Sequence, residues 1–377
     1  MSVPESRDAA MTMMAEHFLP HYAADLEGII QFDMGGDLDY HLVVQGGVHT
    51  LVAGMHRAPS LLLRVSPENY PEIFTGDLTQ LFADGRLGVE GDLALGVTLA
   101  AMLRPQAHAN WEPDRARIER VSAEGAPIER IERRSLESLG EAEFQRVYAR
   151  ASRPLILTGA MGDWGALELT PEALKARFGH LRVVPRVGNY VASAFTEERS
   201  YAPMSMAEYL DSLAPADEKD RPPDSHPPPY LGNNPVPDEL LALMGVPPFC
   251  SSEACGRPSL WLGPAGTVTP LHRDLIDNVL VQIFGRKRLL LFSPEQSALL
   301  GTWQSSPLLD GTGVDPENPD GSAHPRFAEA RRLECILEPA EMLFIPAGWF
   351  HHVRSLSVSF SVNFFKFYEP PAAMHSA

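Results

Sequence analysis

Cysteine is scarce in this sequence, since only Cys250, Cys255 and Cys335 occur among 377 residues. An odd number of cysteines without regular spacing offers no disulfide framework and suits a reducing compartment, so we expect a cytoplasmic protein. Cys250 and Cys255 would make half of a zinc site, but no second Cys/His pair at a suitable spacing accompanies them. Buried thiols are therefore the preferred interpretation.

Long apolar runs and an excess of positive charge are also missing. The N-terminal text MSVPESRDAAMTMMAEHFLPHY contains acidic residues and no uninterrupted apolar core, which is typical of neither a signal peptide nor a membrane span. The formal net charge is −18, and this charge repels phosphate backbones, so we expect no nucleic-acid binding over a broad basic surface. Basic or neutral partners fit the charge better.

The sequence does contain enough apolar material for more than one core. A hydrophobic content of 44% over 377 residues predicts two domains. Between residues 29 and 65, short β-rich runs separated by Gly-Gly and Asp turns indicate an antiparallel meander. The run DLALGVTLAAML, residues 92–103, has almost no polar face. A helix of this kind must be buried or must line an apolar site.

The stretches IIQFDMGGDLDYHLVV and GRLGVEGDLALGVTLAAML carry a resemblance to the sterol carrier protein type 2 family over residues 25–103. The resemblance implies an α+β domain whose five-stranded sheet and helices enclose an apolar tunnel for lipids or acyl chains. A packed core and an open tunnel both remain compatible with the apolar helix. We assign residues 1–105 to this domain, the charged and poorly periodic residues 106–134 to a linker, and residues 135–377 to a second domain.

From Ser259 onward, short β segments separated by Gly and Pro turns predict a double-sheet jelly roll or barrel that is able to hold a small ligand. Residues 355–363 alternate strictly, so their small polar side chains share one face. That face is either solvated or the lining of a wet interior, and both alternatives stay open for Ser361 and Asn363. Upstream, LTPEALKARFG predicts a helix that begins after Thr170 and ends before Gly179.

The stretch TPLHRDLIDN, residues 269–278, places a histidine and an aspartate two positions apart. In an extended segment the side chains at i and i+2 point the same way, so His272 and Asp274 should converge on one side of a strand. A distant histidine would complete a metal site, and His351 and His352 follow a turn after the apolar strand MLFI. Two histidines and one carboxylate form the facial triad that holds Fe(II) with open positions, which a structural zinc site would close.

Lys287 follows His272 by fifteen positions, within the strand-like run QIFGRKRLLLF. A lysine in an apolar strand is costly unless it meets a carboxylate, and an oxo-diacid co-substrate provides one. The alternative is a solvated charge beside Arg286 and Arg288, because the three side chains cannot all face inward. Strand alternation places Lys287 on one face and the two arginines on the other.

A second resemblance is carried by TVTPLHRDLIDNVLVQIFGRKRLLLFSPEQ and MLFIPAGWFHHVRSLSVSFSVNFF. These runs resemble the JmjC and cupin-like Fe(II)/2-oxoglutarate oxygenases, and among them the group similar to the asparaginyl hydroxylase that inhibits hypoxia-inducible factor. The resemblance extends back through PYLGNN to RPLILTGAMGDW and covers most of residues 130 to 370. It implies a mainly β double-stranded β-helix with flanking helices. The roles it implies are iron ligation by His272, Asp274 and His351, binding of the distal 2-oxoglutarate carboxylate by Lys287 and Thr269 with Tyr230 assisting, and proximity to the metal-bound end of the co-substrate for Asn278 and Asn363.

The resemblance implies an enzyme that couples oxidative decarboxylation of 2-oxoglutarate, giving succinate and carbon dioxide, to hydroxylation of a C–H bond. By analogy the substrate is a peptide or protein side chain. A lipophilic molecule or acyl chain delivered by the first domain is an alternative substrate. A non-catalytic lipid- and metal-binding protein, or a zinc isomerase or hydrolase, are the alternative functions, and hydroxylation and demethylation are not distinguished.

Three features have no counterpart in that group from which to assign a role. His352 matches no ligand position, so we expect it to pack or to support a ligand. The insertion Gly301–Pro325 has no match from which a substrate can be identified. The text stops soon after FKFYEPP, so dimerisation through the C-terminal helices used in that group is not expected, and the oligomeric state stays open.

Overall fold

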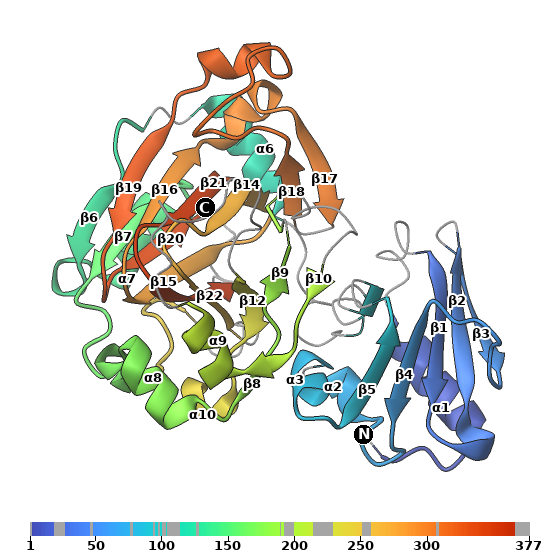
Figure 1. The fold of residues 1–377 in the computed structure, drawn as a ribbon. Coiled ribbons are helices and arrows are strands. Elements are labelled where there is room, and N and C mark those ends of the chain that lie inside the picture. The colour runs from blue at the N-terminus through green and yellow to red at the C-terminus, as the bar shows by residue number, and fades with distance from the viewer. Residues whose placement is uncertain are drawn as a thin grey trace. The chain divides into compact units, whose positions relative to one another are not determined.

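The computed structural model describes residues 2–18, 27–45, 48–75, 78–92, 95, 96, 99, 103, 114–125, 128–188, 190, 191, 200–213, 229–250, 258–306 and 309–365. The chain divides into two compact units (Figure 1). The first comprises Met1–Asn110 with His180–Tyr209, and the second Trp111–Gly179 with Leu210–Ala377. Among the described residues, no helix is both long and apolar enough to cross a bilayer.

The first unit is built on a five-stranded sheet of order β3-β2-β1-β4-β5 (Figure 1). Only β1 and β4 pair in parallel, and the other neighbours are antiparallel. This is the α+β architecture that the resemblance to the sterol carrier family predicted. The strands are β1 Gly28–Asp33, β2 Tyr40–Gln45, β3 Val48–Ala53, β4 Leu61–Val65 and β5 Leu87–Gly91, and the helices are α1 Arg7–His17, η2 Gly36–Leu38, α2 Glu72–Thr75 and α3 Leu78–Ala83.

Aromatic side chains fill much of the core of this sheet. The ring of Phe32 stacks on Tyr40 with centroids 4.8 Å apart. The hydroxyls of Tyr40 and Tyr70 lie 2.6 Å apart, and the Tyr70 hydroxyl donates to the carbonyl of Ala10 at 2.8 Å. These bonds satisfy the buried hydroxyls and tie α1, whose Met14 is also fully buried, to the sheet.

The apolar segment 92–103 lies mostly outside the described residues. Its described leucines, Leu95, Leu99 and Leu103, are buried in the same core. The prediction that this segment is buried therefore holds at these positions. The first unit also contains two short ladders, β8 Arg182–Val183 with β11 Met204–Ser205, and β9 Arg186–Val187 with β10 Ser200–Tyr201.

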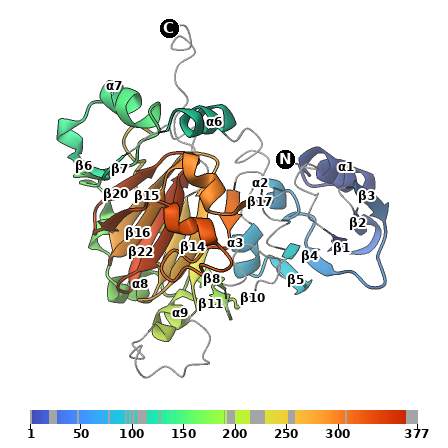
Figure 2. The ribbon, with the colours of Figure 1, turned by 90° about the horizontal axis from the view of Figure 1, so that it is seen from above.

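Two sheets form the second unit, as predicted for a double-stranded β-helix (Figure 2). The larger has the order β12-β13-β22-β15-β20-β7-β6, and the smaller has the order β17-β18-β14-β21-β16-β19. The strands of the larger sheet are β12 Leu231–Pro235, β13 Ser259–Gly263, β22 Ser359–Phe365, β15 Asn278–Phe284, β20 Met342–Ile345, β7 Leu155–Thr158 and β6 Glu132–Ser135. Those of the smaller are β17 Thr302–Ser306, β18 Leu309–Thr312, β14 Val268–Asp274, β21 Phe350–Ser355, β16 Lys287–Phe292 and β19 Leu333–Leu337.

Apolar residues from both sheets meet between them, with Leu280 of β15 and Leu343 of β20 packed in one cluster with Leu289 of β16 and Val353 of β21. Most of the alternating polar face of residues 355–363 is also interior, because Ser355, Ser359, Ser361 and Asn363 are buried, while Ser357 is half-buried. Of the two alternatives for that face, the interior one is correct. The result is a sandwich whose inside is apolar in one part and polar in another.

Helices and short turns surround the two sheets. The predicted helix after Thr170 is α8 Pro171–Phe178, with the Thr170 side chain accepting from the amide of Ala173 and Gly179 at its end. Within the predicted linker 106–134 the structure places α6 Arg115–Glu124 and the start of β6 in the second unit, while the boundaries at 105 and 135 remain predictions. The other elements of the second unit are η3 Leu136–Ser138, α7 Glu141–Phe144, η4 Gln145–Ala149, η5 Gly165–Glu168, α10 Asp238–Leu241, η7 Pro294–Leu299 and η8 Pro325–Glu329. Helix α9 Met206–Ser212 begins in the first unit and ends in the second.

Candidate metal centre

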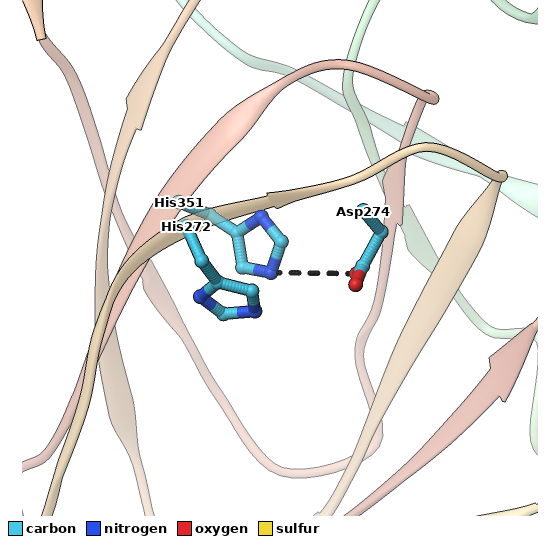
Figure 3. A group of neighbouring side chains, drawn as sticks. All are labelled: His272, Asp274 and His351. Atoms are coloured by element: carbon cyan, nitrogen blue, oxygen red, sulfur yellow. Dashed lines mark ion pairs between the residues drawn. The ribbon is translucent and has the colours of Figure 1, made fainter. Parts of the chain in front are cut away.

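Two neighbouring strands bring the predicted metal ligands together. His272 and Asp274 share one face of β14, and His272 lies directly opposite His351 in the antiparallel ladder with β21. The two imidazole centroids are 4.2 Å apart, and His351 Nε2 lies 3.7 Å from Asp274 Oδ2. One ligand atom from each of the three buried side chains falls within 4.8 Å of the others (Figure 3). The strand pairing thus selects His351, and not His352, as the partner of His272 and Asp274.

Hydrogen bonds set which nitrogen of each imidazole is available as a ligand. The Nδ1 of His272 lies 2.8 Å from the carbonyl of Pro270, and the Nδ1 of His351 lies 3.1 Å from the carbonyl of Trp349. A carbonyl only accepts, so both Nδ1 atoms carry the proton and both Nε2 atoms are the basic nitrogens. Backbone carbonyls orient metal-binding histidines in this way in many proteins.

Burial shifts the pKa values of two of the three side chains. It lowers the pKa of His351 well below 6.5, with His272 adding to the effect, so the His351 imidazole is neutral at pH 7. It also raises the pKa of the Asp274 carboxyl, against His272 and a hydrogen bond from Asn278, which lower it. This carboxylate contacts His351 Nε2 and Asn278 Nδ2, and neither group is charged at pH 7. A bound divalent cation would stabilise this arrangement of one carboxylate and two basic nitrogens.

Two asparagines extend the polar cluster inward. Asn278 at the start of β15 donates from Nδ2 to Asp274 Oδ2 at 3.1 Å. Asn363 of β22 donates from Nδ2 to Asn278 Oδ1 at 2.6 Å. Both are buried, and the chain of bonds fixes the orientation of each amide as well as that of the carboxylate. The structure therefore brings these two predicted site residues to the triad.

Lys287 lies on the inner face of β16, with 2% of its surface exposed. Its Nζ donates to Ser361 Oγ at 2.5 Å, and burial lowers its pKa from 10.5 to about 7. Arg286 and Arg288 do not share this environment, because Arg286 forms a solvent-exposed pair with Glu338 and Arg288 faces the opposite side of the sheet. Alternation along β16 accounts for the position of Arg288, whereas Arg286 precedes the strand.

Tyr230 and Thr269 form a second hydrogen-bonding pair, with their hydroxyl oxygens 3.4 Å apart. Thr269 and Lys287 lie on either side of β21, opposite Val353 and Ser355 respectively. Gly263 leaves room for the tyrosine, since a Cβ there would lie 2.8 Å from the Tyr230 ring. All eight predicted site residues thus come from strands β14, β15, β16, β21 and β22 or, for Tyr230, from the residue before β12.

His352 has a different environment on the outer face of the smaller sheet. Its Nε2 lies 3.8 Å from Glu317 Oε2, and Glu317 also bonds to Arg354 and Arg288. Burial lowers the pKa of His352 to about 4, so this imidazole is neutral at pH 7 and the two arginines compensate Glu317. Although Asp315, Glu317 and His352 are close enough to hold an ion, the adjacent guanidiniums oppose a cation there. Sequence reasoning missed Glu317, because an acidic residue in an insertion follows no strand period.

The insertion 301–325 contributes structure to the second unit. Its strand β18 pairs with β14, placing Gly311 opposite His272, and β17 extends the sheet further. Val314 covers the outer face together with Leu290 and Phe350. Residues 307 and 308 lie outside the described part. Strand β18 of the insertion therefore supports the strand that carries His272 and Asp274.

The cysteines show no sign of metal binding where they are described. The expected burial of the thiols holds for Cys335, whereas Cys250 is partly exposed. Burial raises the pKa of Cys335 to about 12, so this thiol stays protonated. Cys255, the proposed partner of Cys250 in a half zinc site, lies outside the described residues.

Two known protein families together match most of the chain. The family described as "Cupin-like domain" matches residues 141–373. The chain belongs to this cupin-like family. Its N-terminal part, residues 14–104, matches the SCP-2 sterol transfer family. Both resemblances read from the sequence are confirmed, and the cupin-like match includes every residue of the metal centre.

Several relatives with assigned names are similar to part of the chain. Lysine-specific demethylase JMJ30 from Arabidopsis thaliana is 34% identical over 243 residues, which are 62% of this chain and 54% of the relative. Lysine-specific demethylase 8 from Xenopus tropicalis is 33% identical over 229 residues, 59% and 49% of the two chains. tRNA wybutosine-synthesizing protein 5 from Danio rerio is 40% identical over 128 residues, 34% and 38%. The chain spans about half the length of the demethylases it matches.

Proposed function

We propose that this protein is an Fe(II)- and 2-oxoglutarate-dependent dioxygenase that hydroxylates a C–H bond of a peptide or protein side chain. The observation that carries the proposal is the convergence of His272, Asp274 and His351 within 4.8 Å in a buried site. Two imidazole nitrogens and one carboxylate on adjacent strands are the donor set that suits non-haem iron. Membership of the cupin-like family supports the same activity.

In this proposal the three side chains hold Fe(II) through His272 Nε2, His351 Nε2 and an Asp274 carboxylate oxygen. The iron, 2-oxoglutarate and dioxygen would supply the oxidising chemistry, in which one oxygen atom of O2 enters succinate as 2-oxoglutarate loses carbon dioxide and the other enters the substrate. The protein contributes geometry. Backbone carbonyls keep both Nδ1 atoms protonated, and Asn278 orients the carboxylate.

The co-substrate would lie between the triad and Lys287. A protonated Lys287, with the hydroxyls of Thr269 and Tyr230, would bind the distal carboxylate, a charge-assisted arrangement for which Lys287 is already buried and oriented. Asn278 and Asn363 would contact the end of the co-substrate nearest the metal. The low exposure of these side chains would keep bulk water from the oxidant.

A protein substrate is supported by the relatives named lysine-specific demethylases. The net charge of −18 suits a basic target such as a lysine- or arginine-rich segment and opposes the RNA substrate in the name of the third relative. Hydroxylation that is stable and hydroxylation that leads to demethylation begin with the same C–H bond cleavage. Mass spectrometry of a methyl-lysine peptide separates them, because demethylation releases formaldehyde and a stable product gains one oxygen.

The SCP-2 match favours a second candidate, in which the N-terminal domain delivers a lipophilic molecule or acyl chain to the same iron. Titration of the full chain with a fluorescent fatty acid or sterol analogue tests this candidate. Saturable binding that accelerates 2-oxoglutarate turnover would favour it over the peptide substrate. Absence of binding would leave the N-terminal domain as an adaptor.

The proposed activity is tested by loading the full chain anaerobically with Fe(II), adding 2-oxoglutarate, admitting oxygen and measuring succinate. Slow turnover without substrate is expected, and it should vanish in His272→Ala. His324→Ala is the matched control, because His324 lies outside the triad at the start of η8 and should leave turnover unchanged. Wild-type protein that binds neither metal nor 2-oxoglutarate would refute the proposal.

A further inference from the structure

Helix α6 lies between the two family matches, since the SCP-2 match ends at residue 104 and the cupin-like match begins at 141. It nevertheless packs at one end of the two sheets of the second unit (Figure 2). Among its contacts are two turns that adjoin the strands of the metal ligands. One turn, residues 275–277, follows Asp274, and the other, residues 346–349, precedes His351.

The first turn is bonded to α6 at two points. The amide of Asp114, which caps the helix, donates to the carbonyl of Leu275 at 2.8 Å. Arg117 Nη2 donates to Asp277 Oδ1 at 2.5 Å. Leu275 is the residue directly after Asp274, so these bonds hold the end of β14 against the helix.

The same carboxylate reaches the second turn. Asp277 Oδ1 also accepts from the amide of Ala347 at 2.9 Å, four residues before His351. The two turns are joined again where the amide of Gly348 donates to the carbonyl of Asp274 at 2.8 Å. Asp277 is therefore a bridge between the turns, and Arg117 sets the position of that bridge.

Close packing of side chains also holds α6 against the two turns. Ile118 forms a buried cluster with Leu275 of one turn and Ala347 of the other. Gly348 has a φ of +85°, and a Cβ there would lie 2.8 Å from Ile118 Cγ1. The turn before His351 thus needs glycine both for its conformation and for the close approach of the helix.

Arg117 is largely buried and contacts Asp277, Asp114 and the carbonyl of Ala149. Only 14% of its side chain and 18% of that of Asp277 are exposed. Its Nη1 donates to the carbonyl of Ala149 at 2.9 Å, and its Nε lies 2.7 Å from Asp114 Oδ2 in an ion pair without hydrogen-bond geometry. A partly buried ion pair adds little net stability compared with apolar side chains of similar size. The planar guanidinium donates its hydrogen bonds in fixed directions, so these bonds fix the position of Arg117 relative to its acceptors.

We propose that Arg117 is a positioning residue which, through Asp277, holds the turns after Asp274 and before His351 so that the ligands stay at metal-binding distance. This inference rests on the proposed function, because it assumes that the triad binds a metal. It gives the segment between the two family matches a role in the metal centre of the second unit.

The test is titration of the full chain with Co(II), followed by visible absorption, which reports both affinity and coordination geometry. Arg117→Met keeps the apolar stem and removes the guanidinium, and it should weaken Co(II) binding by about tenfold or more. At saturating Co(II) its spectrum should differ from that of the wild type. Arg120→Met is the matched control, because Arg120 lies on the same helix, bonds Glu124 and the carbonyl of Arg150, and should change affinity by less than about twofold.

Asp277→Asn is a second variant, in which an amide oxygen still accepts from Ala347 but the charge facing Arg117 is lost. Asp277→Asn should change the Co(II) spectrum in the same direction as Arg117→Met. If Arg117→Met does not fold, Asp277→Asn still tests the positioning role of the ion pair. Wild-type affinity and spectrum in the folded variant would overturn the positioning role while leaving the proposed function intact. Wild-type protein that binds Co(II) no better than His272→Ala would overturn both.

Discussion

Replacing Lys287 by methionine removes a buried ammonium group while keeping a side chain of similar length. In the proposed complex this group faces a carboxylate of 2-oxoglutarate. A hydrogen bond to a charged partner contributes about 1.5–3 kcal/mol. Lys287→Met should therefore raise the Kd for 2-oxoglutarate by about tenfold to a hundredfold. Metal affinity should change little, because the Lys287 amine bonds Ser361 and not a member of the triad.

The same substitution should stabilise the fold. Burial lowers the pKa of Lys287 from 10.5 to about 7, and carrying the charge into the interior at pH 7 costs on the order of 4 kcal/mol. The folded-state pKa lies below the unfolded one, so this cost is full below pH 7 and fades as the pH rises toward 10.5. The free energy of unfolding of Lys287→Met should exceed that of the wild type at pH 7, and the difference should shrink by pH 9.

Isothermal titration calorimetry of 2-oxoglutarate in the presence of Co(II), and urea unfolding at pH 7 and 9, measure the two effects. In the wild type the Kd should rise as the pH increases above 7, because the free amine must then take up a proton before it binds the carboxylate. Arg286→Met is the matched control, since Arg286 is exposed and should affect neither quantity. Unchanged 2-oxoglutarate affinity together with unchanged or lower stability in Lys287→Met would refute the reasoning.

Three further substitutions test the metal centre and its supports. Asp274→Ala should abolish Co(II) binding without unfolding the protein, and retained binding in the titration would contradict the triad. Glu317→Gln should lower the free energy of unfolding by about 2–3 kcal/mol, because it weakens the bonds to Arg354, and an unchanged urea midpoint would count against this. Trp349→Phe removes the 2.7 Å bond from Nε1 to the carbonyl of Ser152 and should cost about 1–3 kcal/mol by the same assay, with an equal or higher midpoint as the contrary result.

The two folds could be recognised from the sequence because their signals are local. Strand alternation places His272 and Asp274 on one face whatever the rest of the chain does. The same rule separates Lys287 from Arg288. Helix α8 was predicted with its ends, because Thr170 and Gly179 mark them within a few residues.

Several features depend on pairing between distant segments, and periodicity does not encode them. From the residues alone His351 and His352 were equivalent candidates, and the ladder between β14 and β21 places His351 opposite His272. The partner of His352 is Glu317, in an insertion without a strand period. Helix α6 was assigned to a linker because its bonds to Leu275 and Asp277 link residues far apart in sequence.

The sequence by itself therefore determined the two families, the side chains that share a strand face and the chemical types available for a metal and a dicarboxylate. The tertiary structure decided which of those faces is interior, which histidine joins the triad and which distant segments hold the ligand-bearing turns in place. The physical reason is that alternation fixes the relative direction of neighbouring side chains, whereas burial and ligand convergence arise only when separate strands and a helix pack together.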